Sequence, residues 1–571
     1  MTKLVWLIGG EAGFGVREAG LIFAKTCTHA GFNIFGHVEY PSLIRGGHNT
    51  YQVSVDDEVF CQSKNVDIIV ALNKETIDKH TNELSKGGAI IYDSGSMTKD
   101  VEKTNALFYP VPLKQLVTET GGKDIVRNTV AIGASCAVVG LDFSFVKDSL
   151  SEEFKSKGAE IVEMNVKAAK AGYDYIKKNF KNEFAFTLKP KNREEKIVLT
   201  GNDAIGIGAV KAGCNFYAGY PMTPVTSLMQ FFAAHAKDYE IVFRNSADEI
   251  EAINMAIGAS YAGAKSMTAS SGGGYALMVE AIGMAAMTEI PVVIVEGTRT
   301  GPSTGLPTWT EQGDLRFVLH SSHGEFPRIV VAPGDVEECY YKTIETFNLA
   351  YKYQVPAVIL TDRQLGESHM STDKFETDAK NDKFVMDDND AKNDYKRFAF
   401  TESGLSPRSV PGQKNGLYVA NSYEHDETGV YAEDADNTKK MKDKRMKKLE
   451  LILKEIPEPV LHGEKNSDIT LIAWGSTKLP ALQAIKILNE QKISANVLQI
   501  VYMEPFKSEA VAKILNNAKK LLIVENNQTA QLAGLIREKT GIEIKEKLLK
   551  YNGRQFFAEE IADKAKEMLK R

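Results

Sequence analysis

Short apolar segments alternate with longer amphipathic segments along most of the chain, and this pattern is the first structural signal in the sequence. Residues 3–10 (KLVWLIGG) and 67–72 (DIIVAL) are compact apolar runs of the kind found in buried strands. Residues 128–140 (NTVAIGASCAVVG) form an apolar run too long for an ordinary strand, so we expect a buried helix there. A polar stretch at 182–195 predicts a linker after a first domain at 1–181.

The alternation is most regular over residues 196–371, which we predict to be a second domain. Repeated strand and helix patterns predict a mostly parallel sheet with helices on both faces. Such sheets bind ligands at the carboxyl ends of their strands. Glycine-rich segments at 219–221, 270–274 and 297–305 each follow a strand-like run, so we expect them to meet at that edge.

The alternation of strand and helix patterns stops over residues 372–466. These residues are polar and irregular and predict a connector. Within it the basic run 439–448 predicts one exposed helix face, with docking to an acidic partner protein as the alternative. Residues 467–571 resume the strand and helix alternation. The predicted fold class is therefore α/β, with three α/β domains and a long irregular connector.

Composition narrows the classes of function. The chain has 571 residues, with 69 basic and 75 acidic side chains and a net charge of −6, so no broad basic surface for nucleic acid is expected. No uncharged apolar run approaches the ~18 residues that cross a bilayer, and no signal peptide is visible. We therefore expect a cytoplasmic protein that binds neither membrane nor nucleic acid.

The cysteines exclude further chemistry. There are five, and no two of them form a C-x-x-C pair: Cys27, Cys61, Cys136, Cys214 and Cys339. This pattern argues against a disulfide framework, a structural zinc site and an iron–sulfur cluster held by this chain alone.

Two candidate sites lie in the first domain. The turn at residues 9–15 (GGEAGFG) could bind an anion or could only form a tight turn, because Arg17 and Glu18 occupy the places of a final dinucleotide-binding glycine. This motif leaves a nicotinamide-dependent dehydrogenase as an alternative function. In YPSLIRGGHN, Arg45 and His48 flank two glycines, so Arg45 is either a cation at a binding loop or a solvated side chain.

The second domain holds two stronger candidates. In YPMTP, Thr223 could cap the next helix or present its hydroxyl to the cleft beside Tyr220 and Pro221. Asp248, Glu249 and Glu251 begin an apolar helix, where carboxylates complement the helix dipole. Because that helix looks buried, one of the carboxylates is expected to be buried and able to share a proton with a ring nitrogen.

Two further motifs follow. Residues 299–305 (RTGPSTG) place Arg299 at a strand end, where it could clamp a carboxylate or phosphate or simply belong to a crossover loop. Residues 424–427 (EHDE) could suggest a metal site, but adjacent side chains in an irregular segment rarely converge on one ion. We expect them to be solvated.

Six segments in order along the chain resemble one family, the α subunit of 2-oxoacid:ferredoxin oxidoreductases (of the 2-oxoglutarate type) with the γ domain fused at the N-terminus. They are GFGV, YPSLIRGGHNTYQV, GNDAIGIGAVKAGCNFYAGYPMTP, SADEIEAINMAIGASYAGAKSMTASSGGG, TGPSTGLPTWTEQGDL and SYEHDETG. The resemblance implies a γ-type domain at 1–181, a thiamine diphosphate pyrimidine-binding domain at 196–371 and a transketolase-C-like domain at 467–571.

The resemblance also implies a reaction: a 2-oxoacid and coenzyme A give acyl-CoA, carbon dioxide and reduced ferredoxin, with thiamine diphosphate as cofactor. By resemblance, Glu249 bonds the aminopyrimidine ring and Thr223 contacts the carboxylate or keto oxygen of the substrate. Arg45 would lie near the distal end of the substrate, which suits 2-oxoglutarate. Cofactor contacts are expected from the residues around the same strand ends: Tyr220, Pro221, Ser271 and Gly272.

Two departures from the family pattern carry information. Trp309 stands where relatives commonly have arginine or lysine, so a branched or aromatic 2-oxoacid is an alternative substrate unless Arg299 or Arg45 supplies the cation. The chain also lacks the G-D-G motif for Mg²⁺ and a cysteine set for a [4Fe–4S] cluster. The resemblance then implies a β subunit that supplies the metal, the diphosphate site and the cluster in an (αβ)₂ assembly. A non-catalytic scaffold is the remaining alternative.

Overall fold

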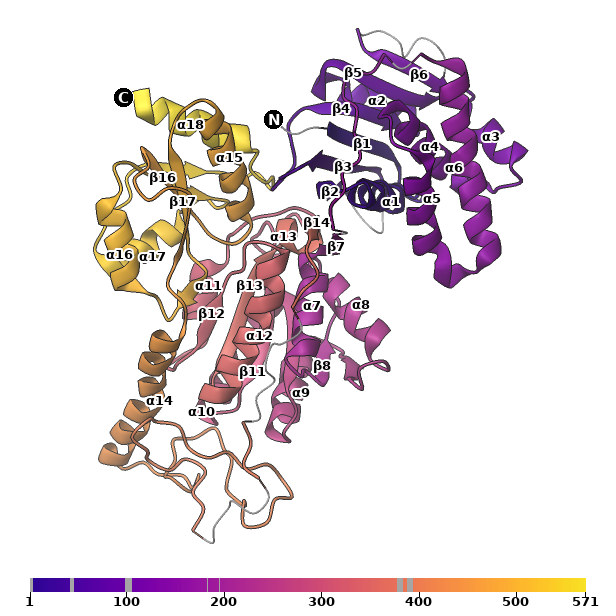
Figure 1. The fold of residues 1–571 in the computed structure, drawn as a ribbon. Helices are drawn as coiled ribbons and strands as arrows, with labels where there is room; N and C mark the ends of the chain where they lie inside the picture. The colour runs from indigo at the N-terminus through magenta and orange to yellow at the C-terminus, as the bar shows by residue number, and fades with distance from the viewer. Residues whose placement is uncertain are drawn as a thin grey trace. The chain divides into compact units, whose positions relative to one another are not determined.

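The computed structural model describes residues 4–41, 46–97, 105–181, 183–194, 196–376, 384–387 and 394–570. The chain divides into two compact units (Figure 1). The first unit comprises Met1–Thr200 and Glu367–Lys374, and the second comprises Gly201–Gly366 and Phe375–Arg571. Each unit is described by itself.

An eight-stranded sheet forms the centre of the first unit. In spatial order its strands are β6 (Leu107–Val111), β5 (Leu84–Asp93), β4 (Val66–Ala71), β1 (Leu4–Glu11), β3 (His48–Asp56), β2 (Asn33–Glu39), β14 (His369–Thr372) and β7 (Ile197–Thr200). The pairs from β6 to β1 are parallel, and those from β1 to β7 are antiparallel. The strands predicted at 3–10 and 67–72 are confirmed as β1 and β4.

Most helices of the first unit pack on one another (Figure 1). They are α1 (Val16–His29), α2 (Lys74–His80), α3 (Leu113–Glu119), α4 (Arg127–Val138), α5 (Phe143–Phe154) and α6 (Ala159–Asn179). Every residue of α4 is buried, which confirms the helix predicted at 128–140. A Cβ on Gly133 would lie 1.9 Å from the Ala169 carbonyl oxygen, so glycine allows the backbones of α4 and α6 to touch.

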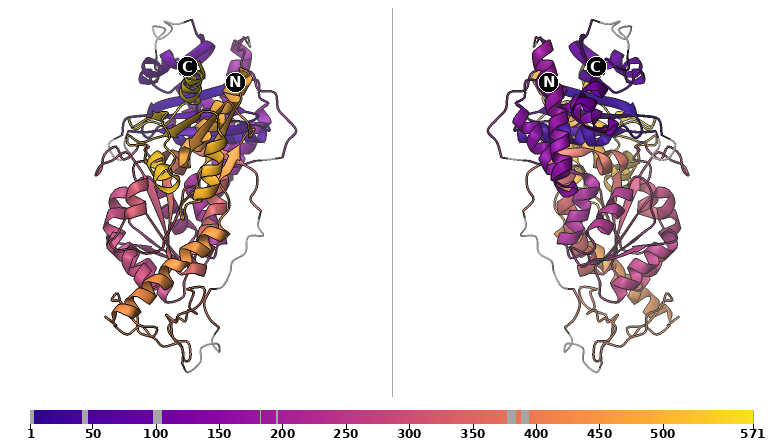
Figure 2. Two further views of the ribbon diagram at one scale, coloured as in Figure 1. Left: turned by 90° about the vertical axis from the view of Figure 1, so that its left-hand side faces the viewer. Right: turned by 90° about the vertical axis from the view of Figure 1, so that its right-hand side faces the viewer.

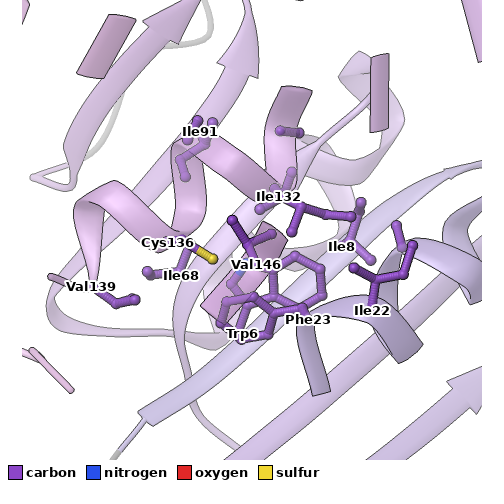
Figure 3. Packing of buried hydrophobic residues seen from close by; sticks show 14 of the residues in the cluster. Trp6, Ile8, Ile22, Phe23, Ile68, Ile91, Ile132, Cys136, Val139 and Val146 are labelled. Carbon is purple, nitrogen blue, oxygen red and sulfur yellow. The ribbon is translucent and has the colours of Figure 1, made fainter. Parts of the chain in front are cut away.

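Aromatic and aliphatic side chains from β1, α1 and α4 form the core of this unit (Figure 3). The Trp6 and Phe23 rings stack with their centroids 4.3 Å apart. The indole Nε1 of Trp6 donates to Ser135 Oγ at 3.0 Å, so the one polar atom of this buried ring has a partner. These two contacts fix the position of β1 relative to α1 and α4.

The second unit contains a seven-stranded sheet. In spatial order its strands are β18 (Tyr502–Glu504), β12 (Ile329–Val331), β13 (Pro356–Asp362), β11 (Val292–Thr298), β10 (Ser266–Ser271), β8 (Phe216–Gly219) and β9 (Val242–Asn245). Every pair is parallel except β12 with β18, which confirms the predicted mostly parallel sheet. Figure 2 shows helices on both sides of this sheet.

The helices around this sheet pack in two groups, α7 against α12 and α9 against α10. Their bounds, in chain order, are α7 (Gly201–Lys211), α8 (Thr226–His235), α9 (Glu249–Tyr261), α10 (Gly272–Met287), α11 (Leu315–His320), α12 (Val336–Tyr353) and α13 (Arg363–Glu367).

A smaller sheet follows at the C-terminal end of the chain. Its strands in spatial order are β15 (Val460–His462), β17 (Ala495–Gln499), β16 (Ile469–Ala473), β19 (Leu521–Glu525) and β20 (Lys547–Leu549). Its helices, with the preceding one, are α14 (Ala435–Glu455), α15 (Lys478–Glu490), α16 (Ser508–Asn517), α17 (Gln531–Thr540) and α18 (Ala558–Lys570). One buried apolar cluster includes Ile294 and Val330 from the larger sheet and Ile472 and Leu498 from the smaller one. The two sheets therefore share a core.

Candidate functional site

The three glycine-rich segments meet at the carboxyl edge of the seven-stranded sheet, as the sequence predicts. Both β8 and β11 pair in parallel with β10. The register sets Ser270 beside Glu296 and Ser271 beside Gly297. The loops that follow these strands therefore begin side by side, at the edge where parallel sheets bind ligands.

The turn after β8 presents the YPMTP residues. Tyr220 and Pro221 are exposed and Thr223 is half-buried. Helix α8 begins only at Thr226, with Val225 in the N-cap position. The capping alternative for Thr223 is therefore wrong, because the turn holds Thr223 ahead of the helix, and its hydroxyl is not committed to the helix end.

Arg299 reaches back from the end of β11 to this turn. Its Nη1 donates to the Thr223 carbonyl oxygen at 2.9 Å. Burial lowers the pKa of Arg299, yet a guanidinium stays charged in proteins. A Cβ on Gly297 would lie 2.6 Å from Val225 Cγ1, so glycine allows the turn to approach the strand. Threonine and arginine are thus held together at one point of the site.

Of the three carboxylates that begin α9, only Glu249 is buried, with 5% of its surface exposed. Asp248 accepts the Glu251 backbone N–H at 2.8 Å, and Glu251 accepts the Ala247 N–H at 2.5 Å. These two side chains satisfy the helix start. Glu249 instead lies against Ser270, whose Oγ is 3.4 Å from its Oε1. The prediction of one buried carboxylate here is confirmed.

The start of α10 packs directly on Glu249. A Cβ on Gly274 would lie 2.4 Å from Glu249 Oε1 and 2.0 Å from Ser270 Oγ, so only glycine fits. Ser271 holds the N-cap position without capping, and no donor or acceptor among the described residues bonds its buried Oγ. Gly272 follows in the first turn. A buried carboxylate and an unpaired hydroxyl at one helix start are suited to a polar ligand ring.

Trp309 lies in the loop after β11, and a cation covers it. The Arg554 guanidinium carbon is 3.1 Å from the centroid of the indole ring. The Thr300 N–H donates to the Trp309 carbonyl at 3.3 Å, which closes the loop. The loop thus gains a positive charge from the C-terminal domain. Sequence reasoning missed Arg554, since no motif surrounds it.

A second contact that the sequence does not reveal fixes the same loop. The Gln312 N–H donates to the Asn526 carbonyl at 2.7 Å, and the Asn526 N–H donates to Gln312 Oε1 at 3.0 Å. Gln312 Nε2 also donates to the Trp474 carbonyl at 2.8 Å. These bonds dock the loop on the smaller sheet.

Glu296 was also missed, although a charged residue within the apolar strand VVIVEGT is a usable signal. It is fully buried. Burial, and next the neighbouring Asp314, raise its pKa well above the usual range. This carboxyl lies behind the start of α10, since a Cβ on Gly272 would be 3.3 Å from its Oε1.

In the first unit, Arg45 lies outside the described residues, so its predicted role stays a prediction. Gly46 and Gly47 have positive φ angles of 74° and 122°, which glycine adopts readily. After them, His48 Nε2 lies 3.1 Å from His80 Nε2. Burial, and next His80, lower the pKa of His48 to about 4.

The glycine turn after β1 is closed by α4. Gly13 and Gly15 have positive φ angles of 92° and 69°. Asn128 Nδ2 donates to the Gly15 carbonyl at 3.1 Å, and a Cβ on Gly15 would lie 2.4 Å from this nitrogen. The Arg127 guanidinium covers the Phe14 ring at 3.9 Å. These contacts support the tight-turn interpretation.

The basic run 439–448 lies in α14, and the prediction of one exposed face is right only in part, because four of its six lysines are exposed and two are buried. Lys444 and Lys448 are buried, and their Nζ atoms donate to Glu289 Oε1 and Oε2, each at 2.5 Å. Arg397 donates to the Glu289 carbonyl at 2.8 Å. Burial raises the pKa of Glu289, but these three cations outweigh burial and hold the pKa well below the usual range. One face of this run is therefore buried, because two of its lysines pair with a buried carboxylate, and the opposite face is exposed.

The EHDE segment is also structural, so the expectation of solvated side chains is wrong in part. Glu424 accepts two bonds from Arg445, at 3.0 and 2.6 Å, and His425 is buried. Glu427 accepts from Lys396 at 2.8 Å. Across the described ranges, no three His, Cys, Asp or Glu side chains are grouped to hold a metal ion. Within the same ranges, no helix has the length and apolar character to cross a bilayer.

Family models match all three domains. Residues 207–446 match pyruvate flavodoxin/ferredoxin oxidoreductase, thiamine diphosphate-binding. Residues 5–175 match pyruvate ferredoxin/flavodoxin oxidoreductase, and residues 460–541 match the transketolase C-terminal domain. The α/β fold with three such domains is the predicted one.

Relatives cover the whole chain. The 2-oxoacid:ferredoxin oxidoreductase subunit alpha of Sulfolobus sp is 34% identical over 98% of this chain and 96% of its own length. The 2-oxoglutarate synthase subunit KorA of Archaeoglobus fulgidus is 33% identical over 58% of this chain and 88% of its own. The 2-oxoglutarate:ferredoxin oxidoreductase from Magnetococcus marinus, solved with 2-oxoglutarate, coenzyme A and succinyl-CoA bound, is 32% identical, with a TM-score of 0.91 over 99% of both chains. The chain therefore belongs to the 2-oxoacid:ferredoxin oxidoreductase family, as an alpha subunit.

Proposed function

We propose that this chain is the α subunit of an enzyme that converts 2-oxoglutarate and coenzyme A to succinyl-CoA and carbon dioxide while reducing ferredoxin. The observation that carries the proposal is Glu249, a buried carboxylate left out of the helix cap and held against Ser270 and Gly274, where β10 passes into α10. The ligands in the Magnetococcus structure support the substrate and coenzyme A.

The residues around Glu249 fit a thiamine pyrimidine ring. When bound, thiamine diphosphate supplies the nucleophilic carbon that decarboxylation of a 2-oxoacid requires. Glu249 would accept a hydrogen bond from a protonated ring nitrogen, a bond strengthened by the low dielectric of a buried site. The unpaired Ser271 hydroxyl offers a second contact. Tyr220, Pro221 and Gly272 would line the same pocket.

Thr223 and Arg299 would bind the reacting end of the substrate. The hydrogen bond from Arg299 to the backbone carbonyl of Thr223 keeps the two residues together at the strand ends. An arginine–carboxylate contact there would be charge-assisted. Arg45 would face the distal carboxylate, and Trp309 would form a wall. Because Arg554 already covers the indole face, the loop favours a dicarboxylate over a branched or aromatic 2-oxoacid.

We further propose a cytoplasmic (αβ)₂ assembly. A β subunit would supply Mg²⁺, the diphosphate site and the [4Fe–4S] cluster that passes electrons to ferredoxin. The five cysteines are buried and none forms a disulfide, which supports electron collection by a partner and a reducing compartment. Ile250 and Leu277 are about half exposed, at 50% and 51%, on α9 and α10. Apolar side chains exposed around the site are suited to a partner surface.

The test is Glu249→Gln in the enzyme assembled with its β subunit. Because glutamine cannot hold a protonated ring nitrogen as a carboxylate does, we expect turnover to fall by about 10²- to 10⁴-fold with assembly intact. Glu251→Gln is the matched control, since an amide oxygen still accepts the Ala247 N–H. Turnover unchanged in Glu249→Gln would refute the assigned role. Comparing kcat/KM for 2-oxoglutarate, pyruvate, and branched and aromatic 2-oxoacids tests the substrate.

A further inference from the structure

Two carboxyl groups meet behind the start of α10, and one of their oxygens lacks a donor. Glu296 is fully buried, and its Oε2 accepts the Thr298 hydroxyl at 2.8 Å. Its Oε1 is also buried, and no donor in the described part of the chain bonds it. A Cβ on Gly272 would lie 3.3 Å from this Oε1 and 2.3 Å from Asp314 Oδ2. The absent side chain of Gly272 thus leaves room for both carboxyl groups.

Asp314 does not cap its own helix, although it stands in the N-cap position. It holds the N-cap position of α11 but makes no side-chain cap. Aspartate is among the preferred N-cap residues because its carboxylate accepts an N–H of the first helical turn. Here the carboxyl instead lies beside that of Glu296, since both carboxyls approach the Cβ position of Gly272. Two ionised carboxylates offer only acceptors and repel each other, so a proton on one of them is needed for the two carboxyls to attract each other and to give the unpaired Oε1 of Glu296 a partner.

We propose that Glu296 and Asp314 share one proton at neutral pH, and that this proton fastens the end of the loop at 299–314 to the start of α10. The role in catalysis rests on the proposed function. Through Gly272 the pair supports the turn that packs on Glu249, so Glu296 and Asp314 are positioning residues. They touch neither substrate nor cofactor in this proposal.

The charged surroundings keep the proton in place. Asp362 from β13 faces Glu296 and disfavours its ionisation, and Tyr275 from α10 also interacts with it. Glu311 of the loop interacts with Asp314. All these neighbours are acidic. Burial is the largest cause that raises the pKa of both carboxyls, followed for Glu296 by Asp314.

The sign of the pH dependence follows. The folded chain keeps this proton at pH values where the unfolded chain has lost it. Between the ordinary carboxyl pKa and the raised pKa of the pair, folded protein therefore binds more protons, and stability falls as pH rises. At alkaline pH the two charges repel, and the loop loosens from α10.

The test is Glu296→Gln in the full chain, with thermal unfolding followed from about pH 5.5 to about pH 9. The glutamine amide can donate to the Asp314 carboxylate without a titrating proton. We expect its Tm to fall less with rising pH than that of the wild type, so that the variant is the more stable at the alkaline end. Glu525→Gln is the matched control. Glu525 is equally buried but accepts from the N–H groups of Leu532 and Ala533, at 2.9 and 3.0 Å. An amide nitrogen opposes these donors, so Tm should drop at every pH.

Two results would overturn the shared proton: a Glu296→Gln curve parallel to the wild type, or a loss at every pH like that of Glu525→Gln. In the assembled enzyme, the alkaline limit of kcat should move up by about one pH unit or more in Glu296→Gln. An unmoved limit, with the Tm effect present, overturns the positioning role alone. Absence of turnover from the wild type with every 2-oxoacid would count against the proposed function, while the Tm curves still decide the proton.

Discussion

Two buried glutamates lie at opposite ends of α10 and have opposite charge states. Glu289 follows the helix and has 1% of its surface exposed, while Glu296, at 0%, lies behind the helix start. Glu289 receives the ammonium groups of Lys444 and Lys448 and stays ionised. Glu296 meets another carboxyl and keeps a proton. Equal burial thus gives different chemistry, and the neighbours decide which.

The dipole of α10 does not explain the difference, because it favours anions at the helix N-terminus and cations at the C-terminus. The side chains around each glutamate outweigh it. The cluster at the C-terminal end attaches the connector, since its cations come from α14 and from Arg397. The pair at the N-terminal end attaches the site loop. One helix therefore uses an ionic contact for assembly and a protonated contact beside the site.

The largest expected effect comes from Glu289→Gln. Three cations would then lie buried without a counter-charge, so the free energy of unfolding should fall by about 3–5 kcal/mol. Denaturant unfolding of the full chain measures it. Glu280→Gln, an exposed position on the same helix, is the control and should stay close to the wild type. A Glu289→Gln variant as stable as this control would show that the cluster does not depend on its carboxylate.

Lys448→Met should have a smaller effect, because Lys444 and Arg397 still serve Glu289. We expect a loss of about 1–2 kcal/mol at neutral pH. Burial lowers the pKa of Lys448 to about 8. Above this pH the folded chain releases a proton that the unfolded chain keeps, so wild-type stability rises with pH. The variant should lose this rise in unfolding experiments over the alkaline range, and the exposed Lys440→Met should retain it. A rise that persists in Lys448→Met would assign it to another group.

The smallest expected effect is that of Asp314→Asn. Its amide can donate to an ionised Glu296, so the free energy of unfolding at neutral pH should change by less than about 0.5 kcal/mol. Asp314→Ala leaves Glu296 without this partner and should cost about 1–3 kcal/mol. Denaturant unfolding of both variants makes the comparison. Equal losses in the two would mean that the contact is not a hydrogen bond through a shared proton.

Much of the second unit could be predicted from the sequence. Apolar runs of strand length and helical repeats are local signals. They predicted the parallel sheet and the meeting of its glycine-rich strand ends at one edge. Glu249 could be identified because its helix is apolar after the first turn. Such a helix is expected to be buried, and a carboxylate at its start is expected to be buried with it. The burial itself needed no knowledge of distant residues.

The rest depends on contacts between distant segments. Lys444 and Lys448 repeat at helical spacing. Charged residues at this spacing normally predict a solvent-exposed helix face. Their buried partner Glu289 lies far away in the chain, so the sequence does not reveal it. Arg554 on Trp309 and Asn526 on Gln312 are of the same kind. Whether Asp314 caps its helix or contacts the Glu296 carboxyl likewise depends on the tertiary fold and not on its neighbours in sequence.

The core shared by the two sheets of the second unit has a consequence for a chain divided in the connector. Ile294 and Val330 pack in the same cluster as Ile472 and Leu498, so the C-terminal domain is held by apolar contact and not by the connector that leads to it. We therefore expect a chain divided within the irregular part of the connector to keep its two fragments associated through this shared core.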